Sequence, residues 1–161
     1  MLELILGTVF FIYFLFIGQL IYGFNRMRRF SKTEFTPKTS FTIVVPFRNE
    51  KENLPNLLHS ISLLNYPKEL VEVILVDDDS DDEFRIQNLE FRIQMIKNVR
   101  KSNSPKKDAI ETAIQIAKHD WIITTDADCL VQKDWLTTFD QYIQENEVEM
   151  VAALSVAMEN L

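Results

Sequence analysis

The chain has 161 residues, of which 47% are hydrophobic and 25% are charged, and its formal net charge is −7. This composition excludes a disordered chain and a fibrous one. The negative charge argues against a general nucleic-acid-binding protein, because contacts with phosphates require a basic surface. The single cysteine, Cys129, cannot form an internal disulfide, which fits a reducing compartment.

Residues 1–25 predict a helix that crosses a membrane. No charged residue occurs from Leu4 to Asn25, and a bilayer-crossing helix needs about 20 apolar residues. A cleaved signal peptide is the alternative, but a basic start and a small-x-small cleavage site are both missing. Only Glu3 precedes the stretch, whereas four basic residues follow it: Arg26, Arg28, Arg29 and Lys32. The positive-inside tendency predicts a single-pass protein of the cell membrane with its soluble part in the cytoplasm.

Residues 26–40 predict a basic juxtamembrane linker, since this stretch is polar and contains Pro37. The remainder, residues 41–161, predicts an α/β domain. Phe41–Val45 is short, β-branched and followed by Pro46, as a buried parallel strand would be. Asn53 is expected to cap the next helix, in which apolar residues recur on one face. They are Leu54, Leu57, Leu58, Ile61 and Leu64.

Strand and helix patterns continue to alternate along the rest of the chain. Val71–Val76 predicts a second strand, and the alternation of Phe91, Ile93 and Met95 with polar residues predicts a third, less buried one. The later elements are a helix with an apolar stripe over Ala109–Ala117, a strand at Trp121–Thr125, a helix at Trp135–Ile143 and a strand at Met150–Val156. Such alternation predicts a mostly parallel sheet with helices on both faces.

Polar or acidic segments follow three of the predicted strands: residues 46–50, 77–82 and 126–128. In an open α/β sheet, ligands bind outside the carboxyl ends of the strands. We therefore expect these segments to form one site.

Asp126 and Asp128 are the candidate metal ligands. In extended backbone, side chains at i and i+2 point to the same side, so the two carboxylates are expected to converge on one cation. Oxygen ligands suit Mg²⁺ or Mn²⁺, which commonly share such sites with substrate phosphates. A solvated acidic turn is the alternative for this pair when it is taken alone.

Other readings of the acidic loop after the second strand fit less well. A calcium loop of the EF-hand type that began at Asp77 would need Gly at position 6 and Glu at position 12, but the chain has Asp82 and Asn88 there. In a receiver-like signalling domain the acidic pair follows the first strand, and here residues 46–50 follow it. A nucleotidyltransferase remains a third possibility with a related sheet.

Four segments, in this order, resemble the family 2 glycosyltransferases. They are Val44–Glu50, Val76–Asp82, Lys106–Ala109 and Thr125–Asp128. The resemblance covers Phe41 to about Val156 and implies the Rossmann-like GT-A fold. It also implies an inverting enzyme that takes a sugar from a UDP- or GDP-sugar donor. The first two segments favour sugar transfer over nucleotidyl transfer.

The resemblance also implies roles for individual residues. Pro46, Asn49 and Glu50 would border the nucleotide base. Asp78 would contact the base, and its neighbour Asp77 would orient the loop.

Lys106 or Lys107 would lie near the nucleotide, although both lysines also fit a helix start that faces solvent. Asp126 and Asp128 would hold a divalent cation, Mn²⁺ or Mg²⁺, that acts on the donor diphosphate. Such a cation neutralises the negative charge that develops as the sugar–phosphate bond breaks.

Inverting transfer also requires a general base for the acceptor hydroxyl, and no candidate is identifiable before Leu161. Four later carboxylates fit surface positions better: Glu145, Glu147, Glu149 and Glu159. We expect the C-terminal half of the fold, with the acceptor site, to be missing from this chain. The sequence thus predicts part of a membrane-anchored transferase that acts on a glycan or lipid acceptor. A truncated, catalytically incompetent nucleotide-sugar-binding module is the alternative.

Overall fold

The computed structural model describes residues 1–26, 36–82, 84 and 91–152. The chain divides into two compact units, Met1–Ser31 and Lys32–Leu161. The first unit contains one helix, α1 (Leu2–Arg26). Within the described residues, Glu3–Arg26 is the one helix long and apolar enough to cross a membrane, and none of its apolar window is buried. That exposure distinguishes it from the core helix of a soluble domain, and its crossing of a membrane stays a prediction.

The second unit is built on a four-stranded parallel sheet with the order β3-β2-β1-β4. The strands are β1 (Phe41–Phe47), β2 (Val71–Asp77), β3 (Arg92–Lys97) and β4 (Trp121–Thr124). The two central strands are almost completely buried, whereas the edge strands β3 and β4 are partly exposed. Continuous apolar sequence suits a central parallel strand that is covered on both faces.

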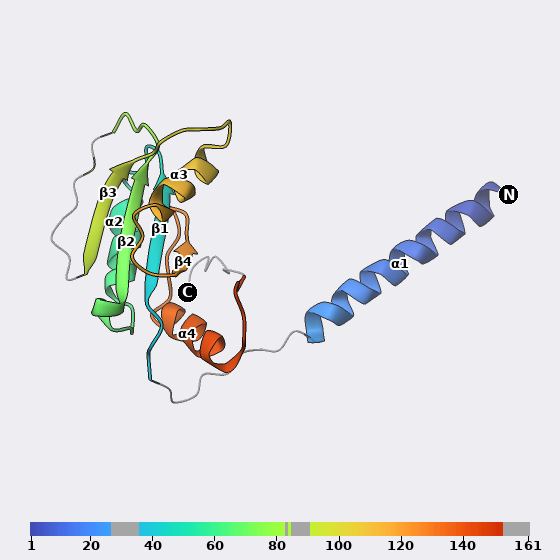
Figure 1. Cartoon of the computed structure of the whole chain (residues 1–161). Coiled ribbons are helices and arrows are strands. Elements are labelled where there is room, and N and C mark those ends of the chain that lie inside the picture. The colour runs from blue at the N-terminus through green and yellow to red at the C-terminus, as the bar shows by residue number, and fades with distance from the viewer. Residues whose placement is uncertain (27–35, 83, 85–90, 153–161) are drawn as a thin grey trace. The chain divides into compact units, whose positions relative to one another are not determined.

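Helices cover both faces of this sheet (Figure 1). They are α2 (Leu54–Ser62), α3 (Pro105–Ile114) and α4 (Trp135–Glu145), with a short 3₁₀ turn, η1 (Lys68–Leu70), before β2. Ile43 and Val45 of β1 pack in one cluster with residues of α2 and α4, and Val44 packs in a second cluster with residues of α3. Successive side chains of a strand point to opposite faces, which produces the two layers. The expected α/β fold is confirmed.

Several boundaries differ from the predictions. Asn53 precedes α2 but makes no capping hydrogen bond; its amide Nδ2 instead donates to Glu50 Oε2 at 2.7 Å. Helix α3 ends at Ile114, so Ala117 lies beyond it, and β4 ends one residue before Thr125. Residues 150–152 carry no strand, and the rest of the predicted strand, residues 153–156, lies outside the described residues.

Asp140 of α4 holds the segment that enters the domain. This carboxylate is fully buried, and it accepts hydrogen bonds from Lys38 N at 2.9 Å, from Tyr66 OH at 2.7 Å and from the backbone and hydroxyl of Thr39. Burial alone would raise the pKa of Asp140. Hydrogen bonds from Gln144, Thr39 and Tyr66 outweigh burial and lower that pKa from its usual value. The last residues of the predicted linker are therefore fastened to α4.

Candidate functional site

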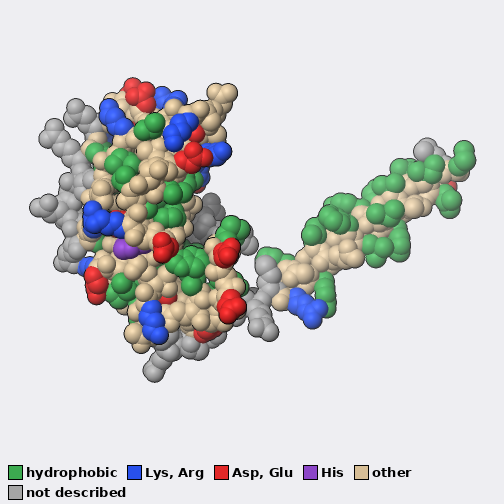
Figure 2. Space-filling model, viewed as in Figure 1, with side chains coloured by type: hydrophobic (Ala, Val, Ile, Leu, Met, Phe, Trp, Pro, Cys, Tyr) green, Lys and Arg blue, Asp and Glu red, His purple; other side chains and the backbone are tan. Residues whose placement is uncertain are grey.

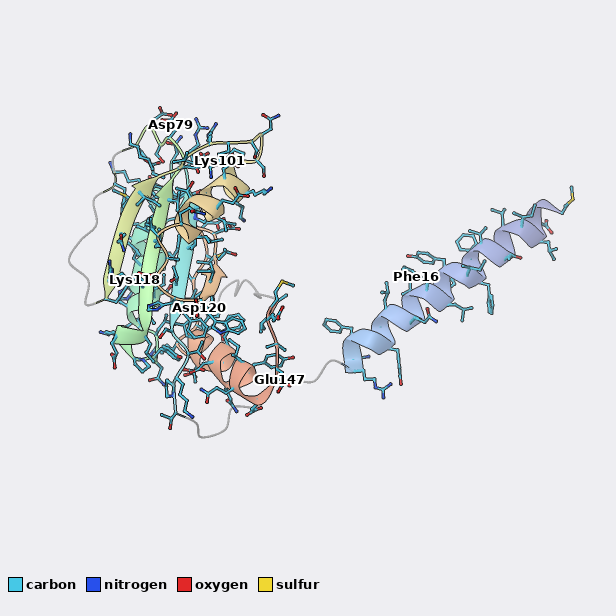
Figure 3. All side chains as sticks on the ribbon, in the orientation of Figure 1. Phe16, Asp79, Lys101, Lys118, Asp120 and Glu147 are labelled. Atoms are coloured by element: carbon cyan, nitrogen blue, oxygen red, sulfur yellow. The ribbon has the colours of Figure 1, made fainter. Side chains whose placement is uncertain are left out.

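The parallel register brings the three predicted segments to one edge of the sheet. Strand β1 lies between β2 and β4, with Phe47 opposite Asp77 and Val44 opposite Thr124. The chain beyond each strand therefore emerges at the same end, as the rule for open α/β sheets requires. Figure 3 shows Asp79 and Lys101 at this end of the sheet, and Lys118 and Asp120 toward the other. We call the end that carries Asp79 the carboxyl edge.

The loops after β1 and β2 are fastened to each other. Asn49 N donates to Ser80 Oγ at 2.9 Å, and Asp81 N donates to Asn49 Oδ1 at 2.7 Å. A further bond of 2.9 Å joins Lys51 N to Asp82 Oδ2. Asn49 has a φ of 57°, in the left-handed region that asparagine tolerates better than most residues. The side-chain oxygen of Asn49 thus shapes the loop pair at the carboxyl edge.

Two of the other residues predicted beside the base, Asp77 and Glu50, accept hydrogen bonds from within their own segments. Asp77 Oδ1 accepts a hydrogen bond of 2.9 Å from Ser80 N, within its own loop. Glu50 Oε2 accepts the bond from Asn53. Pro46 lies within β1, opposite Val76, and is partly exposed. All three residues lie at the carboxyl edge.

Asp78 is the most enclosed of the predicted residues, with 7% of its surface exposed. Arg100 donates to both of its oxygens, from Nε to Oδ1 at 2.8 Å and from Nη2 to Oδ2 at 2.6 Å. Asn98 Nδ2 adds a bond of 2.7 Å to Oδ1. The hydrogen bond from Arg100 is the main reason why the pKa of Asp78 lies below its usual value. Asp78 is thus ionised and held in one orientation.

Sequence reasoning missed Arg100 and Asn98. Both residues follow β3, so the rule that located the other segments would have included them had it been applied to this strand as well. Their position also depends on Asp108 in the first turn of α3, which is buried and accepts bonds from Lys101 N at 2.9 Å and Ser102 N at 2.8 Å. These backbone hydrogen bonds, from Ser102 and then Lys101, lower the pKa of Asp108.

The structure distinguishes between the two candidate lysines. Lys106 Nζ lies 2.5 Å from Asp126 Oδ1, and both side chains are more than half exposed. Lys107 Nζ instead lies 3.6 Å from Glu111 Oε1, one turn later on α3. Lys106 therefore forms an ion pair with Asp126, and Lys107 forms one with Glu111 of its own helix. Exposed ion pairs contribute little to stability. A ligand can therefore separate Lys106 from Asp126 at little cost and bind to either side chain.

The acidic pair lies in a turn, which differs from the extended backbone expected for it. The turn covers Ala127 and Asp128, and Cys129 N donates to Asp126 O at 3.2 Å. Ala127 is buried in the core while Asp126 and Asp128 are exposed, so both carboxylates still lie on the solvent side. The turn, and not strand alternation, thus sets the positions of the two carboxylates.

The carboxylates of Asp126 and Asp128 supply only some of the oxygen ligands that a hard cation needs. Within the described residues, no three His, Cys, Asp or Glu side chains lie close enough together to hold a metal ion. Two carboxylates can supply two oxygen ligands, and Mg²⁺ commonly takes the others from substrate phosphates and water. Asp126 and Asp128 therefore fit a cation that arrives with a diphosphate.

A hollow of about 570 Å³ lies away from the carboxyl edge, near the amino ends of β2 and β3. It is lined by Lys68, Glu69, Val71, Glu72, Phe91, Arg92, Lys118 and His119. Its lysines and arginine are nearly balanced by its two glutamates, and none of the predicted site residues lines it. At the carboxyl edge, by contrast, acidic and basic side chains crowd the top of the molecule in Figure 2. The residues predicted to bind a donor thus lie at the carboxyl edge and not around the hollow.

Residues 42–158 match the family model described as glycosyl transferase family 2. The chain belongs to this family, which confirms the resemblance found in the sequence.

A curated relative is the poly(ribitol-phosphate) β-N-acetylglucosaminyltransferase TarS of Staphylococcus aureus strain Mu50, 24% identical over 122 residues. The match covers 69% of this chain and 20% of TarS, so the chain spans about a fifth of that relative's length.

Solved structures share the fold. The crystal structure of S. aureus TarS 1–349 with UDP-GlcNAc matches with a TM-score of 0.60 and 21% identity, over 76% of this chain and 37% of that one. The mannosyltransferase PcManGT from Pyrobaculum calidifontis, in complex with GDP-Man and Mn²⁺, matches with a TM-score of 0.54 and 22% identity, over 76% of this chain and 39% of that one. The fold is thus that of nucleotide-sugar-bound glycosyltransferases.

Proposed function

We propose that the chain is the donor-binding part of a membrane-anchored, inverting glycosyltransferase. It binds a nucleotide-diphosphate sugar at the carboxyl edge, and the sugar passes to a glycan or lipid acceptor. The bound donors of the structurally similar proteins, UDP-GlcNAc and GDP-Man, support a nucleotide-sugar donor. The apolar helix α1, followed directly by basic residues, supports the anchor with the domain on the cytoplasmic side.

One observation supports the proposal most directly: the carboxyl edge carries both an enclosed hydrogen-bond acceptor, Asp78, and an exposed ion pair, Lys106 with Asp126. Asp78 is enclosed and ionised, whereas Lys106 and Asp126 are exposed. These two chemistries suit the two ends of a nucleotide diphosphate. Asp78 receives the base, flanked by Pro46, Asn49, Glu50 and Asp77.

At the diphosphate end, Lys106 supplies positive charge beside the leaving phosphate. Asp126 and Asp128 are the residues that would hold Mn²⁺ or Mg²⁺, and that ion would supply charge neutralisation on the diphosphate as the sugar leaves. When the donor binds, the ammonium group of Lys106 leaves Asp126 and contacts a phosphate oxygen. The carboxylate oxygen of Asp126 then becomes free to bind the cation. Lys107 contributes at longer range, because its ammonium group already faces Glu111.

Isothermal titration tests the proposed donor site. The chain in detergent is titrated with UDP and with GDP, in Mn²⁺ and again in chelator. We expect at least one nucleotide to bind at least ten times more weakly in chelator, because like charges on the diphosphate and the acidic pair then face each other. Equal affinity in both conditions would contradict the metal role of Asp126 and Asp128.

A matched pair of variants locates the effect. Asp128→Ala is expected to weaken the binding of that diphosphate in Mn²⁺ by about tenfold or more, which corresponds to the loss of one ionic ligand. Glu147→Ala removes a carboxylate that Figure 3 shows far from Asp79, and it is expected to change the affinity less than twofold. Equal losses in the two variants would place the site elsewhere.

A second candidate is a membrane-tethered module that binds a nucleotide sugar without transferring it. It is favoured by the positions of the described glutamates after the acidic pair. Glu145 ends α4, Glu147 and Glu149 follow it, and Glu147 lies far from the carboxyl edge. We expect the chain alone to transfer no sugar in a radiolabelled-donor assay on membranes. Labelled glycan or lipid product would contradict the second candidate and support the enzyme.

A further inference from the structure

The hollow near the amino ends of β2 and β3 is lined by a buried carboxylate that has one oxygen without a hydrogen bond. Glu72 is 1% exposed, and its Oε1 accepts hydrogen bonds from Thr42 Oγ1 at 2.7 Å and from Lys118 N at 2.6 Å. Its Oε2 is buried and accepts none from any described residue. Arg92 Nε lies 3.9 Å from Oε2, which is too long for a hydrogen bond. Because buried polar atoms are normally hydrogen-bonded, we expect a further donor at Oε2.

The rim of the hollow carries an excess of positive charge. Its exposed residues are Lys68, Glu69, Arg92 and Lys118, so three cationic groups lie there with one carboxylate. The second glutamate of the hollow, Glu72, contributes little to the rim, because only 2% of its side chain is exposed. Arginine binds phosphate through parallel hydrogen bonds, and lysine binds it as a point charge. The rim therefore suits a phosphate group.

The floor of the hollow is apolar beside the carboxylate. Val71 and Phe91 line it and are 6% and 9% exposed. The volume of about 570 Å³ is typical of a small-molecule site, which is roughly 300–1,000 Å³. A ligand that fits all three features has an apolar face, a hydrogen-bond donor and a negative charge. A sugar phosphate combines them, since its ring has a C–H face and carries hydroxyl groups.

We propose that this hollow binds a sugar phosphate. A hydroxyl group of the sugar donates to Glu72 Oε2, and the C–H face of the ring packs on Phe91. The phosphate contacts Arg92 and Lys118. The Arg92 side chain is 48% exposed, so it can turn toward the phosphate and leave Oε2 to the hydroxyl group. The proposal goes beyond the proposed function, because none of the residues of the hollow belongs to the proposed donor site.

The test is isothermal titration of the full chain in detergent with glucose 6-phosphate, glucose and inorganic phosphate. We expect glucose 6-phosphate to bind at least ten times more tightly than the other two, since it alone carries both the hydroxyl groups and the phosphate. Its affinity is expected to stay the same in saturating UDP and Mn²⁺, because the hollow lies away from the carboxyl edge. Competition with UDP would place the sugar phosphate in the proposed donor site and overturn the proposal.

Glu72→Gln separates the sugar from the phosphate. Glutamine keeps an oxygen for Thr42 and Lys118 N, but an N–H donor replaces Oε2. We expect glucose 6-phosphate to bind about tenfold more weakly, a typical loss for one hydrogen bond to a charged group. Inorganic phosphate is expected to bind no more weakly than before, since a negative charge has been removed. An unchanged affinity for glucose 6-phosphate would overturn the role of Oε2.

Lys118→Ala provides a second variant in case Glu72→Gln does not fold, because its side chain is exposed. We expect it to weaken the binding of glucose 6-phosphate about fivefold, as the loss of one exposed charge contact would. Lys133→Ala, the same change at an exposed lysine outside the hollow, is expected to change the affinity less than twofold. Equal losses in the two variants would mean that surface charge, and not the hollow, attracts the phosphate.

Two further outcomes would overturn the proposal. Inorganic phosphate that binds as tightly as glucose 6-phosphate would mean that an anion alone is sufficient. Phosphatidylglycerol has both hydroxyl groups and a phosphate in its headgroup. If it displaces glucose 6-phosphate when it is added to the detergent, the hollow belongs to a lipid headgroup and not to a free sugar phosphate.

Discussion

Asp78 and Asp126 both follow strands of the same sheet, yet their surroundings are opposite. The side chain of Asp78 is 10% exposed and accepts three hydrogen bonds, whereas that of Asp126 is 54% exposed and faces one flexible lysine. A group that is enclosed before any ligand arrives is preorganised, which lowers the entropy cost of binding. In the proposed donor site, the protein alone would therefore form the end that receives the base, while the ligand would complete the end that receives the diphosphate.

The largest loss of nucleotide affinity is expected when Asp78, at the proposed base end of the site, is removed. Asp78→Ala deletes the acceptor of Arg100 and Asn98 and leaves both without their partner. We expect UDP affinity to fall by more than 100-fold and uridine binding to disappear, as measured by titration. Asp81→Ala in the same loop removes an exposed carboxylate and serves as the control, with a change below threefold. Similar losses in both variants would mean that loop charge, and not the Asp78 cluster, determines binding.

A smaller loss of affinity, limited to ligands with a diphosphate, is expected from a change of Asp126 at the proposed diphosphate end. Asp126→Asn keeps the shape but removes the charge that would hold a cation. We expect UDP affinity in Mn²⁺ to fall by roughly tenfold, since one charge-assisted contact is lost. Uridine, which has no diphosphate, should bind as before. If uridine binding also weakens, the two ends are not independent.

The two lysines sharpen the comparison further. Lys106→Ala removes the ammonium group beside Asp126 and is expected to weaken UDP binding about fivefold, a typical loss for one exposed charge contact. Lys107→Ala removes a group that pairs with Glu111 and is expected to change it less than twofold. Titration at low and high salt measures both, because screening reduces exposed charge contacts. If Lys107→Ala weakened UDP binding more than Lys106→Ala does, Lys107 and not Lys106 would be the lysine beside the diphosphate.

The smallest effect is expected from pH on the base end. The pKa of Asp78 is lowered, chiefly by the hydrogen bond from Arg100, so Asp78 stays ionised at every pH above the usual aspartate value of about 4. Uridine affinity should therefore change less than twofold between pH 8 and pH 5, as measured by titration. A decline in this range would mean that Asp78 does not receive the base.

The same lowered pKa values predict the acid stability of the domain. Asp78, Asp108 and Asp140 all ionise more readily in the folded chain than their usual pKa implies. Their contribution to the free energy of unfolding is present above about pH 4 and is lost as pH falls below that value. Thermal unfolding followed by circular dichroism should show a steady melting temperature from pH 7 to pH 5 and a decline below pH 4. Asp140→Asn should reduce the size of that decline.

Local patterns were sufficient for most elements of the fold, although residues 150–152 of the predicted last strand carry no strand. The β-branched run of β1, the leucine stripe of α2 and the acidic tips after the strands were all readable, because each depends on residues within one turn or one strand. Two of the predictions failed where neighbouring residues adopt a different local arrangement. Asn53 donates to Glu50 instead of capping α2, and the turn at Ala127 replaced an extended backbone.

The sequence by itself determined the class of the protein: a parallel α/β domain of the glycosyltransferase family 2 type, behind an apolar helix. Only the tertiary structure decided which side chains meet. Asp78 pairs with Arg100 across 22 positions of the chain, and Lys106 pairs with Asp126 across 20. The physical reason is that strand order and register, which bring distant loops to one edge, depend on the packing of the whole sheet and not on any single segment.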